Sequence, residues 1–221
     1  MTAFLPDADI QESFTRELSA AIERSPPKTP IDAEALATAI TQGFEAAVAA
    51  NRDAVIDGPS EQHLQRCAAM LAGYRALSTQ IDDEVWTLAV LRDALLTPRM
   101  ATVREWLGER MGVDPEWPEG AYAATQANFK ARGGRVFGKA YTYEQEVKDE
   151  TRNFVNVTSC FFNDFFHRNE TPQLTQLCCA LDMLWADELN EGAYNVRFER
   201  PATMARGDDC CRFQFSRTGA T

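Results

Sequence analysis

Residues 152–158, with the sequence RNFVNVT, decide the fold class of this 221-residue chain. Polar and apolar residues alternate along the segment and β-formers are frequent in it, which is typical of a strand with one buried face. Residues 136–143 also alternate and are expected to form its antiparallel partner, with the polar stretch 144–150 between them. The two segments predict a β-hairpin in a chain whose other patterns are mostly helical.

A second pair of strands is expected at residues 194–199 and 210–217, around the polar loop 201–209. A helix that begins at Thr171-Pro172 and runs to about Leu189 separates the two pairs, because threonine is a favourable N-cap and proline suits the first turn. The predicted fold class is therefore α+β. An N-terminal helical region is followed by a small antiparallel sheet of about four strands in two hairpins, packed with helices.

Helical periodicity and Pro or Gly punctuation predict further helices at 3–24, 29–56, from about Ser60, 82–96, 103–111 and 121–132. Thr97-Pro98 is expected to end the fourth of these helices, and strand-like segments are expected to follow Gly133-Gly134. We expect two regions. Residues 1–118 form a helical region, in which helix 3–24 precedes a proline-rich linker, and residues 119–221 form an α+β region that carries the site.

The charge of the chain restricts its partners. Thirty-three acidic and 22 basic residues give a net charge of −11, which argues against binding to nucleic acid or to an anionic membrane surface. Residues 1–130 hold 20 acidic and 11 basic side chains, a net −9, so the acidity lies mostly in the helical region. No secretory signal and no apolar stretch of about 20 residues is visible. We therefore expect a cytoplasmic protein without a membrane partner.

Five of the six cysteines lie at or after residue 160, and two pairs of them are adjacent in sequence, at 178–179 and 210–211. This spacing is not that of a zinc module, so we expect no metal and no cofactor. Adjacent residues point in different directions on a helix and to opposite faces on a strand. Only one member of each pair is therefore expected to face a common site, while the other packs in the core.

Two charged residues stand close to these cysteines in the predicted structure. Asp182 follows Cys179 by three positions on the same helix, so the carboxylate and one thiol share a face. Such a carboxylate suits a general base or the partner of a cationic substrate, although an aspartate on a solvated helix flank is an equal alternative. Arg200 ends a predicted strand at the loop that leads into the second cysteine pair.

Four motifs follow one another in the second half of the chain: FVNVTSC at 154–160, C-x-x-D at 179–182, F-x-R at 198–200 and G-x-x-C-C-x-F at 207–213. In this order they resemble the L-2-amino-thiazoline-4-carboxylic acid hydrolase family over about residues 120–217. The chain departs from the family pattern at Phe161 and Pro201, where members often have proline and threonine. These departures leave the shape of the pocket floor and the exact substrate open.

The resemblance implies a hydrolase that adds water to the carbon between sulfur and nitrogen of a small heterocycle, such as 2-aminothiazoline-4-carboxylate. It implies Asp182, Cys179 and Cys160 as catalytic residues, and Arg200 and Cys211 as substrate-binding residues. Asp182 would hold the amidine-like group or deprotonate water, and Arg200 would bind the substrate carboxylate. Direct attack by water and covalent attack by one of the thiols both remain open.

Two other classes of function are also compatible with these residues. One is a non-enzymatic small-ligand-binding domain related to vinyl-reductase-like folds, and the other is a cysteine-based metal or redox site. A polar set converging on one cavity favours the enzyme, whereas a purely apolar cavity favours the binding domain. The expected partner is a small-molecule substrate. The helical region covers the site or forms a homodimer interface in this interpretation.

Overall fold

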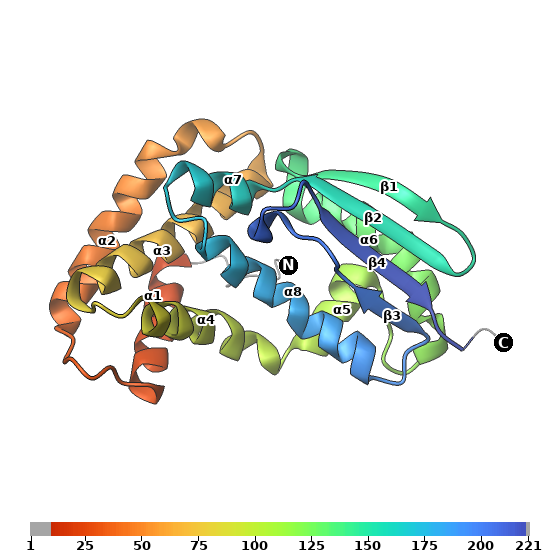
Figure 1. Ribbon diagram of the computed structural model, residues 1–221, viewed down its shortest axis with the longest axis horizontal. Helices are drawn as coiled ribbons and strands as arrows, with labels where there is room; N and C mark the ends of the chain where they lie inside the picture. Colours follow the sequence, from red (N-terminus) through yellow and green to blue (C-terminus); the bar gives the residue numbers. More distant parts are fainter. Residues whose placement is uncertain (1–9, 220–221) are drawn as a thin grey trace.

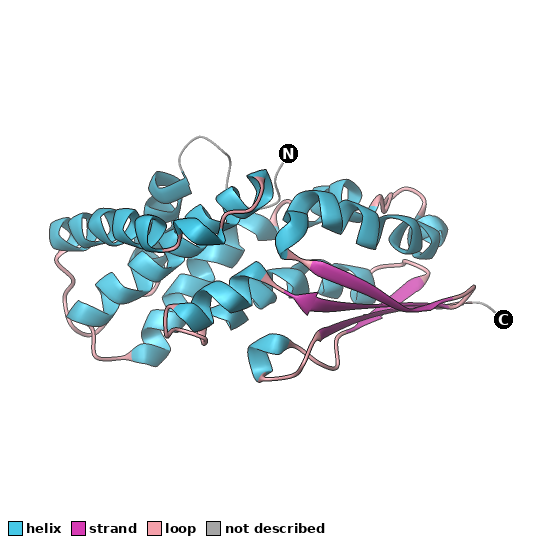
Figure 2. Cartoon of the chain, turned by 90° about the horizontal axis from the view of Figure 1, so that it is seen from above, coloured by secondary structure: helices cyan, strands magenta, loops and turns pink. Residues whose placement is uncertain are grey.

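A four-stranded antiparallel sheet lies at one end of the molecule and a bundle of helices at the other (Figure 1, Figure 2). The computed structural model describes residues 10–219. The strands are β1 (Thr142–Lys148), β2 (Arg152–Ser159), β3 (Val196–Glu199) and β4 (Cys211–Arg217), in the spatial order β1-β2-β4-β3. The predicted α+β class, with four strands in two hairpins, is confirmed.

The sheet buries one of its faces. Alternate residues of the strands, among them Val155, Val157, Phe213 and Phe215, are buried, while their neighbours in sequence are more exposed. The buried side chains form one core with residues of α5 (Val103–Met111), α6 (Ala121–Phe137) and α8 (Leu174–Glu191). This arrangement is usual for antiparallel sheets and explains the alternation in the sequence.

The second core lies in the helical bundle. It is formed by α1 (Ile10–Arg24), α2 (Ala33–Ala50), α3 (Gly58–Gln80), α4 (Glu84–Met100) and α7 (Phe161–Arg168), with contributions from α6 and α8. Helix α8 contributes to both cores: Leu174 and Leu177 pack in the bundle, whereas Leu181 and Trp185 pack under the sheet. Helix α7 follows the first hairpin yet packs with α3, so the bundle includes residues from both sides of position 118. The division at 118 stays a prediction.

Two helix ends in the bundle differ from the predictions. Helix α2 ends at Ala50 and is followed by a short 3-10 turn, so the predicted extension to Ile56 is wrong. Helix α3 begins at Gly58 because Asp57 is its N-cap. The Asp57 carboxylate accepts from the Ser60 N–H at 2.8 Å, and the Ser60 hydroxyl accepts from the Asp57 N–H at 2.8 Å. Ser60 thus closes a capping box three residues into the helix instead of starting it.

The predicted break at Thr97-Pro98 is also wrong, because α4 continues through Pro98 to Met100. Proline removes one backbone donor and disfavours the turn before it. Leu96, one residue before Thr97, is buried in the core under the sheet. Tertiary packing therefore holds the last turn of α4 in place against its local preference.

Helix α6 continues through Gly133 and Gly134 to Phe137, so the predicted helix end at Arg132 and the predicted strand at 136–143 are wrong. The helix ends instead at Gly138, whose φ of +71° is a conformation that favours glycine. Gly133 has a packing role. A Cβ on Gly133 would lie 2.9 Å from the Tyr143 hydroxyl oxygen, so glycine allows the tyrosine ring to lie against the helix.

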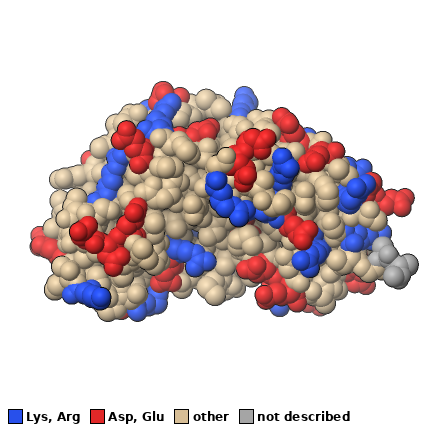
Figure 3. Space-filling view, in the orientation of Figure 1, with Lys and Arg blue, Asp and Glu red and all other residues tan. Residues whose placement is uncertain are grey.

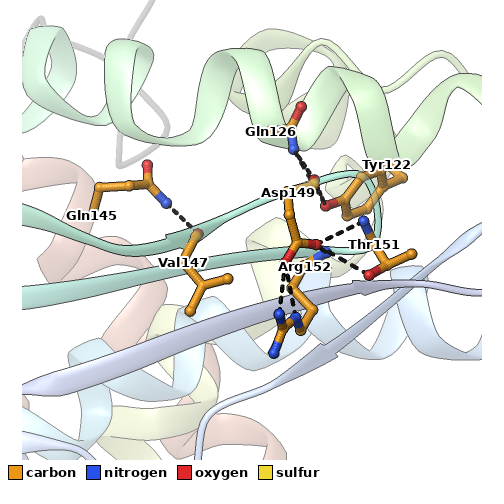
Figure 4. Close-up of polar contacts among 7 residues, drawn as sticks. All are labelled: Tyr122, Gln126, Gln145, Val147, Asp149, Thr151 and Arg152. Atoms are coloured by element: carbon orange, nitrogen blue, oxygen red, sulfur yellow. Dashed lines mark hydrogen bonds and ion pairs between the residues drawn. The ribbon is translucent and has the colours of Figure 1, made fainter.

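The tip of the first hairpin is fixed to α6 (Figure 4). The Asp149 carboxylate accepts from the backbone N–H groups of Thr151 and Arg152 at 2.9 and 2.7 Å and pairs with the Arg152 guanidinium at 2.8 Å. These donors, the Thr151 N–H first, lower the pKa of Asp149 to about 2. The Asp149 carbonyl accepts from the Tyr122 hydroxyl at 2.9 Å and from Gln126 at 2.7 Å. The turn between β1 and β2 is therefore held against α6.

Charged side chains of both signs are mixed on the surface. Acidic and basic side chains are interspersed over the face in Figure 3 and do not gather into a patch of one sign. Within residues 10–219, no helix is both long enough and apolar enough to traverse a lipid bilayer. Residues 3–9 of the first predicted helix lie outside the described part of the chain.

Candidate functional site

A small cavity of about 60 Å³ lies where the two cores meet. Its apolar wall is aromatic and includes Phe129 and Phe137 of α6, Phe162 of α7 and Phe213 of β4. The five residues singled out from the sequence all line it, and they are Cys160, Cys179, Asp182, Arg200 and Cys211. The cavity thus combines an aromatic wall with a convergent polar set, and its size admits only a small ligand.

Asp182 and Arg200 are bound to each other. One carboxylate oxygen of Asp182 lies 3.0 Å from Arg200 Nη1, and the other accepts from Trp185 Nε1 at 3.2 Å. A second guanidinium nitrogen of Arg200 donates to the Cys179 carbonyl oxygen at 3.0 Å. The side chain of Arg200 is 8% exposed and that of Asp182 is 21% exposed, so the pair is largely shielded from solvent. Asp182 is therefore not a fully solvated flank residue.

Local structure fixes the position of Arg200. Strand β3 ends at Glu199, and its Phe198 exchanges two hydrogen bonds with the Asn190 side chain near the end of α8, at 2.8 and 3.0 Å. These bonds tie the edge strand to the helix that carries Asp182. The Arg200 guanidinium also lies 5.6 Å from the centre of the Phe213 ring, within cation–π range.

Two of the site cysteines are partly buried thiols of low acidity. Cys160 is the N-cap residue of α7, and its Sγ donates to the Tyr141 hydroxyl oxygen at 3.6 Å. Burial raises the pKa of Cys160 to about 12. Burial, followed by the negative charge of Asp182, raises the pKa of Cys179 to about 12, and Arg200 offsets this only in part. Both side chains are therefore neutral thiols at neutral pH.

The third site cysteine, Cys211, is held by the loop that precedes it. Its Sγ accepts from the Met204 backbone N–H at 3.4 Å, and burial raises its pKa. The loop is closed by the Asp208 carboxylate, which accepts from the Thr203 N–H at 2.7 Å, and by Gly207 with a φ of +91°. The loop therefore fixes the thiol at the cavity wall.

Only one of the two cysteine pairs follows the expectation that a single member faces the site. Cys211 lines the cavity and Cys210 does not, as expected for neighbours on a strand. Cys178 and Cys179 both line it, because neighbours on a helix are only about 100° apart. Cys178 is nevertheless buried, with its Sγ 3.8 Å from the Met70 sulfur in the bundle. Among residues 10–219, no three His, Cys, Asp or Glu side chains are placed to hold a metal ion.

Four polar residues of the cavity wall were not singled out by the sequence analysis, and they are Arg110, Tyr141, Tyr143 and Thr175. The position of Arg110 in the sequence could have indicated a buried charge. It stands three and four positions after Leu107 and Trp106, which places a charge on the apolar stripe of a short helix. The two tyrosines could not be placed because the first strand was predicted several residues too early.

His63 lies behind the aromatic wall, with 1% of its surface exposed. Its Nε2 is 3.2 Å from the Phe137 carbonyl oxygen, and its ring centroid is 5.2 Å from that of Phe162. Burial, and then the positive charge of Arg66, lower its pKa from 6.5 to about 4. Asp57 acts in the opposite direction and Arg110 adds to the decrease. His63 is therefore a neutral packing residue in the folded protein.

We predict that the stability of the protein decreases as the pH falls from about 6.5 to about 4. In this window the unfolded chain binds a proton on His63 that the folded chain does not, so the free energy of unfolding falls by up to about 3 kcal/mol. Urea titrations over this range, compared between wild type and His63→Gln, isolate the effect because other titrations cancel. Parallel pH profiles of the two proteins would contradict the prediction.

Comparison with known protein families identifies a match. The family model described as L-2-amino-thiazoline-4-carboxylic acid hydrolase matches residues 62–215, which is more than half of the chain. The match begins within α3 and so extends well before the motifs at 154–213. No curated protein and no solved structure matches the chain.

Proposed function

Because the chain belongs to the L-2-amino-thiazoline-4-carboxylic acid hydrolase family, we propose that it opens a small sulfur- and nitrogen-containing ring by hydrolysis. The substrate class is a cyclic isothiourea such as 2-aminothiazoline-4-carboxylate. The observation that carries the proposal is the convergence of a carboxylate, two arginines and four thiols on one small cavity. A largely shielded ion pair in a cavity is the kind of polar group that orients and activates a substrate.

The proposed reaction balances with water as the only co-reactant. Asp182 accepts a proton from water, and the oxygen adds to the ring carbon between sulfur and nitrogen. Asp182 passes this proton to the ring nitrogen. The carbon–sulfur bond then breaks as the added oxygen becomes a carbonyl, the second proton of the water goes to the leaving sulfur, and the product is N-carbamoyl-cysteine. Arg200 holds the Asp182 carboxylate in position, and the neutral thiols of Cys160 and Cys179 contact the substrate without taking part in proton transfer.

The state of the thiols supports direct attack by water over covalent catalysis. A thiol nucleophile must be deprotonated, and enzymes that use one lower its pKa with a nearby cation or a helix N-terminus. Here burial is the largest effect and raises the pKa of both Cys160 and Cys179 to about 12. The N–H groups at the start of α7 act against it at Cys160, and the charge of Arg200 acts against it at Cys179, but neither outweighs burial. Few of these thiols are then deprotonated at neutral pH, which makes a water nucleophile the better supported route.

The alternatives have less support. A purely ligand-binding domain has no need of the Asp182–Arg200 pair on its cavity wall. A metal centre needs at least three converging ligands, which the described residues do not bring together. A homodimer formed through residues 1–118 and a cytoplasmic location remain predictions.

The test of the proposal is release of free thiol from 2-aminothiazoline-4-carboxylate by the purified protein. We expect turnover by the wild type, with N-carbamoyl-cysteine identified by mass spectrometry. A thiol-free ring analogue, with oxygen in place of sulfur, serves as the control substrate that gives no thiol signal. If the protein turned over neither this substrate nor other cyclic isothioureas, the proposed substrate class would be wrong.

We predict that Cys160→Ser and Cys179→Ser each retain activity within about tenfold of the wild type. In a direct hydrolysis the thiols contact the substrate without forming a bond to it, so serine preserves most of the contact. Loss of a covalent nucleophile would instead reduce kcat by roughly 10³-fold or more. Steady-state rates of thiol release decide between the two, and Cys67→Ser serves as the control for a buried cysteine outside the cavity. A covalent adduct detected by mass spectrometry would establish the alternative.

A further inference from the structure

Arg110 is a buried cation that has no ion-pair partner within residues 10–219. It lies on α5 with 8% of its surface exposed, and it lines the cavity. Its Nη1 is buried and has no hydrogen-bond partner, and among residues 10–219 no carboxylate forms an ion pair with it. A buried charge without a partner is costly, so such groups are retained where they serve a ligand.

The contacts that Arg110 does make leave its donors free. Its guanidinium carbon lies 4.2 Å from the centre of the Phe137 ring and 5.7 Å from that of Trp106. These cation–π contacts use the flat face of the group and not its N–H bonds. Arg110 is also not needed to cap α5, because Arg132 donates to the carbonyl oxygens of Gly108 and Glu109 at 2.8 and 2.6 Å.

Arg200 is in the opposite situation. Its guanidinium already pairs with Asp182 and donates to the Cys179 carbonyl oxygen. A substrate carboxylate that bound to Arg200 would lie beside the Asp182 carboxylate and would compete with it for the same donors. Like charges at that distance repel each other, so the arginine next to Asp182 is poorly suited to a second anion.

We propose that Arg110 binds the carboxylate of the substrate, and that Arg200 is a positioning residue that holds Asp182. The inference rests on the proposed function for the identity of the ring, but it needs only that the ligand carries a carboxylate. Arginine suits this role because its planar donors match the two oxygens of a carboxylate. A zwitterionic heterocycle would then lie with its carboxylate at Arg110 and its amidine-like carbon near Asp182.

Tyr143 supports this orientation because it lies within electrostatic reach of both groups. Burial raises the pKa of Tyr143, the charge of Arg110 lowers it and the charge of Asp182 raises it. The cavity is therefore polarised, with a free cation on α5 and a carboxylate on α8 acting on the same phenol. A ligand with charges of both signs is complementary to that field.

The experiment compares the affinity for an acid with the affinity for its neutral amide. The probes are 2-aminothiazole-4-carboxylate, an aromatic analogue without the reactive ring, and its 4-carboxamide, each titrated by calorimetry. We expect the wild type to prefer the acid by about 100-fold, as is typical of a desolvated charge pair. Arg110→Met is expected to abolish the preference, because methionine has a similar shape and no charge. Arg104→Met, an exposed arginine on the same helix, is expected to leave it unchanged.

Two further variants separate binding from catalysis and from folding. Arg200→Met is expected to keep the preference for the acid in binding but to lose kcat in thiol release. Thermal unfolding of Arg110→Met is expected at the wild-type temperature or above it, since an unpaired buried charge is replaced by an apolar side chain. Arg110→Gln serves as a second uncharged variant if methionine disturbs the fold.

The outcomes distinguish this inference from the proposed function. If Arg110→Met and Arg110→Gln keep the wild-type preference for the acid, or if the wild type shows none, the inference is overturned. Loss of the preference in Arg200→Met but not in the Arg110 variants would also overturn it. A wild type that prefers the acid through Arg110 yet releases no thiol would support the carboxylate subsite and reject the proposed reaction.

Discussion

An Asp182→Asn variant is expected to lose about three orders of magnitude in kcat for thiol release, with little change in KM. Asparagine has nearly the same shape, and its single oxygen can still accept from Arg200 or from Trp185, but it cannot accept the proton from water. General base catalysis contributes roughly 10²- to 10⁴-fold, which sets the size of the effect. Steady-state kinetics on 2-aminothiazoline-4-carboxylate measure it directly.

The matched control is Asp187→Asn, which changes an exposed aspartate on the same helix, outside the cavity. This variant should have wild-type kinetics. If Asp182→Asn stayed within tenfold of the wild type, Asp182 would not be the general base. An increase in KM with unchanged kcat would indicate that Asp182 binds the substrate without transferring a proton.

A Trp185→Ala variant is expected to lose about 3–5 kcal/mol of folding free energy, as large-to-small substitutions at aromatic core positions do. Trp185 is 1% exposed, and its ring centre lies 4.6 Å from that of Phe198 and 6.1 Å from that of Phe215. Removing it would leave a cavity between α8 and the buried face of the sheet. Urea denaturation followed by circular dichroism measures the loss.

Two comparisons make this prediction specific. Trp117 is 59% exposed, so Trp117→Ala should change the stability by less than about 0.5 kcal/mol. Trp185→Phe keeps a ring in the core but removes the donor to Asp182. The increase in activation free energy calculated from kcat should therefore exceed the loss of folding free energy. Equal stability losses in Trp185→Ala and Trp117→Ala would mean that Trp185 is not a central packing residue.

The sequence predicted the class of fold because strand alternation and the buried face of a sheet express the same physical constraint. Residues 152–158 alternate since every second side chain of β2 packs under the sheet. Helix ends were less predictable, because a single proline or glycine can be overruled by packing. Pro98 lies inside α4 and does not end it. Gly133 does not end α6 either, and its lack of a side chain makes room for the Tyr143 ring.

The candidate site was predicted in part. The motifs singled out five residues that line one cavity, yet they could not reveal that Asp182 and Arg200 pair with each other. That pairing depends on how β3 docks against α8, which is a long-range contact. Arg110 was missed because it lies on α5, far from the motifs in sequence, and joins the site only through tertiary packing.

Helix α8 belongs to both cores, and this has a consequence for how the protein can change during evolution. Cys179 and Asp182 lie on the stretch of α8 between its bundle-packing residue Leu177 and its sheet-packing residue Trp185. Neither the bundle nor the sheet can assemble the cavity alone. Selection for the chemistry therefore also preserves the docking of the two halves, and substitutions far from the ligand are constrained wherever they would tilt this shared helix.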